Sequence, residues 1–348
     1  MKWILVGLLT ALTAAAQTPV ETALTLNTEG NRAGESGNYP EAQRLYRESI
    51  QIWRSLGPAY EAHTAGTLLN LAVAMTDQGQ RAAAAKVLEE ALALHRHSLG
   101  AKHYRTISNL NVLANNYLMM GDPDRAEALY QETLPIEREL YPDDVQTART
   151  LEGLAFGLVR RGRSPEALPL VEEALRIAIQ SSGEESLDTA LAYTSVAEVY
   201  RTTGSGARAL PLYRRARALY LKQLGPDHPR VATLLSQEGL ILMQDGKLAL
   251  AEQSMSQAVK SLRNSCPACL ELSVVESNLG LLRMRQKRYR EADEAYSAAI
   301  ELREKFTANA GPELADSLQS LAEVREKEHL FDDAARLSSR AQMIRGYR

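Results

Sequence analysis

The chain has 348 residues, of which 45% are hydrophobic and 24% charged, and its net charge is −3 at pH 7. This near-neutral balance gives no electrostatic basis for nucleic-acid binding, which depends on clustered positive charge. The length exceeds that of a usual single-core domain, a limit that does not apply to a stack of repeats.

The first sixteen residues have the pattern of a secretory signal peptide. A charged start, Met1-Lys2, precedes an apolar run over 3–16 that ends in three alanines. The run is short for a membrane span. We therefore predict cleavage after Ala16, a secreted or periplasmic mature protein over 17–348, and no stable membrane anchor after cleavage. An uncleaved anchor or an amphipathic helix is the alternative.

The rest of the chain repeats every 41 or 42 residues. Five residues before most of the repeated alanines stands a glycine, which Lys287 and His329 replace in the last two units, and twelve residues before each alanine stands another small residue. A fixed period of this size indicates a stack of supersecondary units. The repeated alanines are Ala42, Ala84, Ala126, Ala167, Ala209, Ala251, Ala292 and Ala334.

Large apolar residues surround the small positions at spacings of three and four, as Leu68 and Leu71 do before Gly79. Such spacings put residues on one helical face, and the glycine fits a tight turn with positive φ. Each unit is therefore predicted to form helix A, a turn and helix B, with the small residues where the helix axes come closest. The predicted repeats lie near 22–56, 64–98, 106–140, 147–181, 189–223, 231–263, 272–306 and 314–345.

The pattern resembles the tetratricopeptide repeat (TPR), and its period near 42 rather than about 34 resembles the kinesin-light-chain type. The run Leu224-Gly225-Pro226-Asp227-His228-Pro229 is similar to the loop of that type. The resemblance covers roughly residues 20–348. It implies an all-α, right-handed TPR superhelix, an α-solenoid of about eight helix-turn-helix repeats in a single domain. It also implies that helix A lines a concave groove for a protein or peptide ligand.

Polar side chains occupy the inward positions that the resemblance assigns to helix A. An asparagine amide offers donors and an acceptor, so an aligned set could hydrogen-bond a peptide backbone without reading its sequence. The alternative for each residue is a hydrogen bond between repeats or plain solvation. The partner-binding candidates are Asn27, Asn31, Asn70, Asn111, Asn115, Ser277 and Asn278.

The middle of the array departs from this pattern. The corresponding pairs are Glu152-Gly153, Thr194-Ser195 and Ser236-Gln237, and mixed charge from Glu198 and Arg201 accompanies them. A uniform peptide track along the whole groove is therefore not predicted.

The two cysteines, Cys266 and Cys269, form a C-x-x-C pair in a loop between repeats. Such a pair can be a redox centre, half of a zinc site or a structural disulfide. The pair lies in a loop rather than at the N-terminus of a helix that follows a strand, and no second cysteine pair completes a four-cysteine zinc site. We therefore favour a local disulfide that staples this loop in an oxidising compartment. Free thiols and redox catalysis are the alternatives. His103 and His228 recur at one loop position, which indicates a structural contact rather than a metal ligand.

The sequence contains neither a Gly-rich phosphate loop nor a G-x-S-x-G elbow. We therefore predict a non-enzymatic interaction scaffold, without metal or cofactor, that binds a partner peptide or segment in its groove outside the cytoplasm. One alternative is a self-assembling structural protein. The other is a thiol-disulfide active protein that uses Cys266 and Cys269.

Replacing Ala126 by Leu tests the close-packing interpretation. The larger side chain should overpack the contact between two helices and destabilise the protein by ~1–3 kcal/mol. A lower thermal midpoint is the expected result, and an unchanged midpoint would contradict close packing at this position.

Overall fold

The computed structural model describes residues 18–306 and 311–346. These residues form sixteen α-helices and one short 3-10 helix, η1 (Pro58–Tyr60). Odd-numbered helices are the A helices of the repeats, and even-numbered helices are the B helices. The α-helices are α1 (Pro19–Glu35), α2 (Tyr39–Ser55), α3 (Glu61–Asp77), α4 (Arg81–Leu99), α5 (Tyr104–Met120), α6 (Pro123–Leu140), α7 (Val145–Arg160), α8 (Ser164–Ser182), α9 (Leu187–Thr202), α10 (Gly206–Leu224), α11 (Pro229–Gln244), α12 (Leu248–Ser265), α13 (Leu270–Arg285), α14 (Tyr289–Phe306), α15 (Pro312–Lys327) and α16 (Phe331–Gly346).

Eight A/B pairs confirm the predicted all-α array, but each A helix begins two or three residues before its predicted start. The predicted starts fall inside the first turn of each helix, because a helix begins just after its capping residue. The His103 side chain caps α5 by accepting a hydrogen bond from the backbone N–H of Arg105 at 3.1 Å. His228 caps α11 in the same way at 3.2 Å. The recurring histidine is therefore a structural contact, as predicted.

The repeated small residues lie where the two helices of a repeat meet. All eight repeated alanines are buried, none more than 2% exposed. A Cβ atom built on Gly30 would lie 2.6 Å from Cε1 of Tyr46, and one on Gly239 would lie 2.7 Å from Cγ of Met255. The large residue four positions after the repeated alanine thus fills the space that a side chain on helix A would need.

The turn inside each repeat requires a left-handed residue. Six turns use glycine with φ between 74° and 83°, at Gly37, Gly79, Gly121, Gly162, Gly204 and Gly246. In the last two repeats Lys287 and His329 adopt φ of 60° and 63°. The turn geometry therefore persists where the glycine does not, at the steric cost that a Cβ atom brings.

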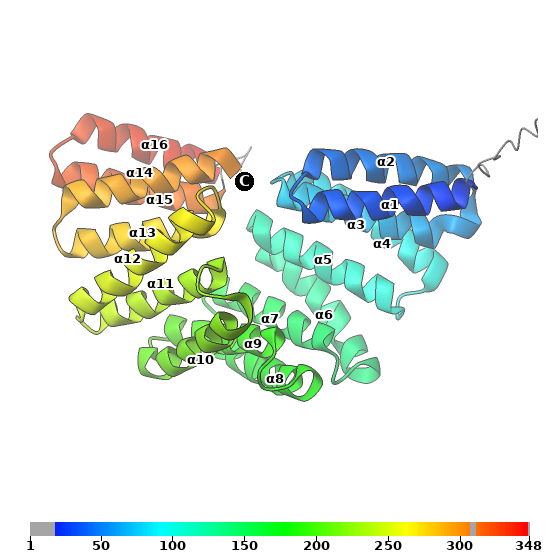
Figure 1. Ribbon diagram of the computed structural model, residues 1–348, viewed down its shortest axis with the longest axis horizontal. Coiled ribbons are helices and arrows are strands. Elements are labelled where there is room, and N and C mark those ends of the chain that lie inside the picture. Colours follow the sequence, from blue (N-terminus) through cyan, green and yellow to red (C-terminus); the bar gives the residue numbers. More distant parts are fainter. Residues whose placement is uncertain (1–17, 307–310, 347–348) are drawn as a thin grey trace, which may run out of the picture.

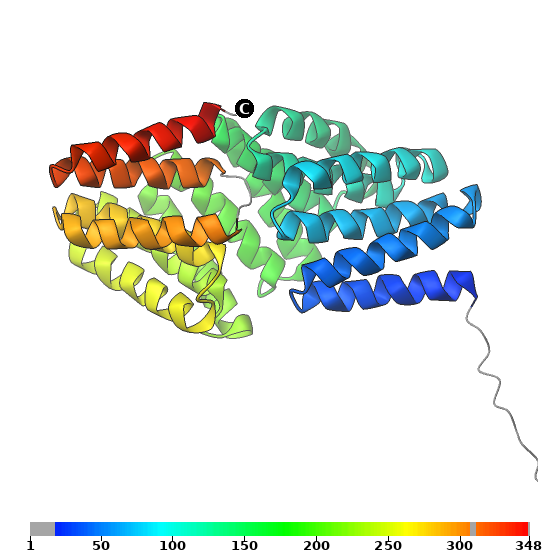
Figure 2. The same cartoon turned by 90° about the horizontal axis from the view of Figure 1, so that it is seen from above.

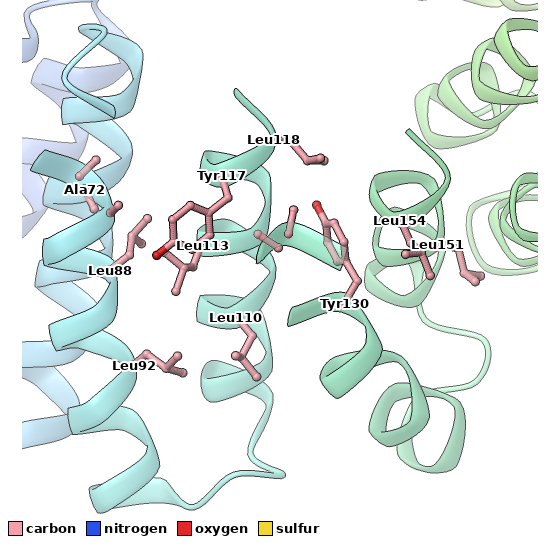
Figure 3. Close-up of a cluster of buried hydrophobic side chains, with 14 of the residues drawn as sticks. Ala72, Leu88, Leu92, Leu110, Leu113, Tyr117, Leu118, Tyr130, Leu151 and Leu154 are labelled. Carbon is pink, nitrogen blue, oxygen red and sulfur yellow. The ribbon is translucent and has the colours of Figure 1, made fainter. Parts of the chain in front are cut away.

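The buried hydrophobic clusters extend across neighbouring repeats rather than staying within one. Figure 3 shows Leu88 and Leu92 of α4 pointing toward α5, where Leu110, Leu113 and Tyr117 lie in the same buried cluster. Each helix pair therefore buries its apolar face only when the next pair is present, which is how a solenoid gains stability.

The repeats wind into a right-handed superhelix that forms an arch, with α7, α9 and α11 on its inner side and α8 and α10 outside (Figure 1). The array curls far enough for repeat 8 to approach repeat 4, as the view from above shows (Figure 2). There Arg160 Nη1 of α7 lies 3.5 Å from Glu313 Oε1 of α15. The concave face is therefore enclosed on several sides by A helices.

Replacing Lys287 by Gly tests the strain in the seventh turn. Glycine removes the Cβ penalty of the left-handed conformation, so stability should rise by about 0.5–1 kcal/mol after the entropy cost of glycine. Chemical denaturation measures the change. Lys287→Ala is the control, because it removes the exposed side chain and keeps the Cβ atom; it should match the wild type. A lower unfolding free energy for Lys287→Gly would contradict the presence of strain at this turn.

Candidate functional site

The first three predicted groove residues form one hydrogen-bonded group between α1 and α3. Asn70 Nδ2 donates to Asn27 Oδ1 at 3.2 Å and to Asn31 Oδ1 at 3.3 Å. The Tyr46 hydroxyl of α2 donates to Asn31 Oδ1 at 2.8 Å. Asn31 is exposed, and the other two are half-buried. These amides join neighbouring repeats and still present polar atoms to the groove.

Asn115 and Asn111 lie in different environments although both are on α5. Asn115 is exposed, and its Oδ1 accepts a hydrogen bond from the Tyr130 hydroxyl at 2.7 Å. Asn111 is only 3% exposed, and its Nδ2 donates to Glu137 Oε1 at 3.0 Å and to Thr150 Oγ1 at 2.8 Å. The structure therefore corrects the prediction for Asn111, which is a buried link between repeats and does not face a ligand.

Ser277 and Asn278 of α13 are half-buried and also connect repeats. Asn278 Nδ2 donates to Ser236 Oγ of α11 at 3.0 Å, and Ser277 Oγ lies 3.3 Å from Ser317 Oγ of α15. Hydrogen bonds between repeats, the alternative weighed from the sequence, are thus present at both positions. Their partial exposure leaves them at the groove surface.

A repeated tyrosine ties the core to this polar face. Tyr46, Tyr130 and Tyr213 each donate a hydrogen bond to a residue fifteen positions earlier on helix A: Asn31, Asn115 and Glu198 respectively. Glu198 therefore occupies the place that asparagine has in repeats 1 and 3. The fixed offset from the tyrosine was the sequence signal that could have identified Glu198 as a groove residue.

Two cavities lie along the inner face. The N-terminal cavity, of about 330 Å³, is bounded by α1, α3 and α5, and Asn27 and Asn70 line it together with Trp53, His63 and Arg105. The central cavity, of about 210 Å³, lies among α7, α9 and α11. Its lining residues are Glu152, Ala155, Phe156, Val159, Val171, Thr194, Ser195, Glu198, Val199, Tyr213, Thr233, Leu234 and Gln237.

The two carboxyl groups of the central cavity differ in charge state. Burial raises the pKa of Glu198, but hydrogen bonds and charge from Arg201 outweigh it, so the net pKa is lowered. Burial raises the pKa of Glu152 to about 7, opposed in part by a hydrogen bond that Ser195 Oγ donates at 3.1 Å. Glu198 is thus ionised and paired at neutral pH, whereas Glu152 exchanges a proton near neutrality.

The loop cysteines are free thiols in the structure rather than the predicted disulfide. Cys269 Sγ donates a hydrogen bond to the backbone oxygen of Cys266 at 3.0 Å. Burial raises the pKa of Cys269 to about 12, with a further contribution from the neighbouring Cys266 thiol. Because the thiolate is the reactive form, this environment disfavours nucleophilic reactivity at Cys269.

Over residues 18–306 and 311–346, no three His, Cys, Asp or Glu side chains converge as a metal site. None of the helices in those ranges combines the length and apolar character needed to span a bilayer.

The chain belongs to the tetratricopeptide repeat family. Its family model matches residues 21–96, 63–139, 146–222 and 188–264, and a second tetratricopeptide repeat model matches residues 277–306. The predicted family is therefore confirmed, and this membership supports a role in protein interaction.

Solved structures show the same fold. A Rap protein complexed with Competence and Sporulation Factor has a TM-score of 0.70 at 15% identity, covering 94% of this chain and 86% of that chain. A Rap conjugation gene regulator of plasmid pLS20, in complex with the Phr* peptide, has a TM-score of 0.61 at 17% identity and covers 81% and 75%. A putative kinesin light chain of Podosopora anserina, with nearly identical TPR-like repeats, has a TM-score of 0.51 at 20% identity and covers 61% and 100%.

Curated relatives contradict the predicted location. Proteins named Clustered mitochondria protein homolog are 27% identical over 210 residues in Candida albicans and 24% identical over 203 residues in Homo sapiens. The match covers 59% and 58% of this chain, which spans about 15% of the length of either relative.

A name that refers to mitochondria, in two eukaryotes, does not fit a secreted or periplasmic protein. That predicted location is therefore wrong. The predicted signal peptide, 1–16, lies outside the described residues.

Glu137 should make stability depend on pH. It is 1% exposed, its Oε2 has no hydrogen-bond partner among the described residues, and burial raises its pKa to about 7 against the hydrogen bonds from Thr150 and Asn111. Since the folded pKa lies above the unfolded value, the stabilisation is complete below about pH 4.3 and is lost as the pH rises through 7.

The difference in unfolding free energy between Glu137→Gln and the wild type should therefore be more favourable to the variant at pH 8 than at pH 5, by on the order of 1–3 kcal/mol. Urea denaturation at both pH values measures this difference. Glu132→Gln, on the exposed face of the same helix, should follow the wild type at each pH. An equal difference from the wild type at pH 5 and pH 8 for Glu137→Gln would show that Glu137 does not carry the effect.

Proposed function

We propose that this chain is a non-enzymatic scaffold that binds a segment of a partner protein, or a peptide, in its concave groove. The observation that carries the proposal is the position of the groove amides, a name used here for Asn27, Asn31, Asn70 and Asn115. Asn27 and Asn70 line the N-terminal cavity, and Asn31 and Asn115 are exposed on the same series of A helices.

The groove amides are positioned by the core rather than by flexible loops. Tyr46 and Tyr130 fix Asn31 and Asn115 through their hydroxyl groups, so each amide keeps its Nδ2 donors available with little loss of side-chain entropy on binding. Ser277 and Asn278 extend the polar face toward the C-terminal end. The peptide held by the Rap regulator of similar fold supports this type of ligand.

The test begins with a phage-displayed library of random 12-residue peptides, selected on the full 348-residue chain. Selected peptides are synthesised, and their affinities for the chain are measured by fluorescence polarisation. The variant that replaces all four groove amides by alanine should bind at least about tenfold more weakly, because each lost hydrogen bond contributes roughly 0.5–1.5 kcal/mol.

The matched control replaces four exposed amides on B helices by alanine: Gln51, Gln253, Gln257 and Asn264. It should bind like the wild type, and the thermal midpoints of both variants show whether they are folded. Failure of the wild type to select any peptide would contradict groove binding. An equal loss of peptide affinity in the control variant would show that the binding site does not lie on the A helices.

A further inference from the structure

The polar contacts that join neighbouring A helices are interrupted at one place. Side-chain hydrogen bonds connect α1 to α3, α3 to α5, α5 to α7, α7 to α9, α11 to α13 and α13 to α15. Within the part of the chain that the structure describes, none connects α9 to α11, and these two helices do not pack closely against each other as α7 and α9 do. The central cavity lies at this opening.

The central cavity combines apolar walls with unsatisfied acceptors. Phe156, Val199 and Leu234 form walls from three different helices. Gln237 Oε1 is buried and has no hydrogen-bond partner among the described residues. A buried acceptor without a partner is costly, so an occupant that donates a hydrogen bond there would be favoured.

Glu152 has no ion-pair partner for its ionised form. The charged groups that face it are Arg149 of α7, Asp188 of α9 and Arg230 of α11. Arg149 is paired with Asp188 at 3.0 Å, and Arg230 donates to the Tyr220 hydroxyl at 3.0 Å, so both arginines are held by other groups. Among the residues described, no cation lies within ion-pair distance of Glu152.

Size and chemistry together select one kind of occupant. A volume of about 210 Å³ is below the roughly 300–1,000 Å³ of sites for whole small-molecule ligands and suits a single side chain. A lysine or arginine side chain has an apolar stem for the walls and a charged donor for the acceptors. An acidic or purely apolar side chain would leave Glu152 and Gln237 unsatisfied.

We propose that the central cavity anchors one basic side chain of the segment bound in the groove, with its stem against Phe156 and Leu234 and its donor group at Glu152 and Gln237. The inference rests on the proposed function, and it adds the class of residue that the partner must present. Glu152 is here a binding residue with no catalytic role.

The peptides selected on the wild-type chain provide the first test. They should share a lysine or arginine, and replacing that residue by norleucine, which keeps the stem and removes the charge, should weaken binding by about tenfold or more. Glu152→Gln retains the acceptor for Ser195 and removes the charge, so for this variant the lysine and norleucine peptides should differ by no more than about twofold. Glu326→Gln, an exposed change on α15, should behave like the wild type.

The pH dependence gives an independent readout. Because the pKa of Glu152 is raised to about 7, affinity for the basic peptides should rise between pH 6 and pH 8 in the wild type and stay constant in Glu152→Gln. If Glu152→Gln is poorly folded, Gln237→Met is the substitute variant. It removes the second acceptor and should reduce the preference for the lysine peptide over the norleucine peptide.

Peptides that bind the groove without a basic residue, or that bind Glu152→Gln as selectively as the wild type, would overturn this inference and leave the proposed function standing. Selection of no peptide at all would overturn the proposed function itself.

Discussion

The close approach of helices A and B at two small residues is the constraint on which the rest of the structure depends. Each repeated alanine is buried to 2% exposure or less, and the facing position on helix A is alanine or glycine. With the axes this close, the large residue one turn beyond the alanine reaches across the pair. The separation of the helices thus sets both the packing inside a repeat and the surface that it offers to the next one.

The large residue four positions after the repeated alanine also connects the core to the concave face. Tyr213 is fully buried, yet its hydroxyl donates to Glu198 at 2.6 Å, on the surface of the central cavity. A change in core packing would therefore displace polar groups in the groove, since both belong to one side chain. Groups held in this way lose little freedom on binding, which favours recognition of a segment by a preorganised surface.

Departure from the repeat pattern is concentrated in the middle of the array. Where the outer repeats carry amides and hydroxyls that pair between A helices, the central repeats carry Glu152, Glu198 and Gln237 around an opening between α9 and α11. Glu198 is ion-paired with Arg201 and accepts a hydrogen bond from the Tyr213 hydroxyl. The outer repeats therefore present mainly hydrogen-bonding groups, whereas the centre presents a cavity with its own charge.

The sequence by itself determined the family, the number of repeats and the turn positions, because these follow from local spacing: a period of 41 or 42 residues, helical faces and a residue with positive φ. It also identified the asparagines of helix A, although not the burial of Asn111. The tertiary structure decided which of those side chains pair, which remain exposed and where a cavity opens, because each depends on how successive repeats rotate about the superhelix axis. Residues 41 to 43 positions apart, such as Glu152 and Ser195, become neighbours only through that rotation. No spacing within a single repeat encodes it.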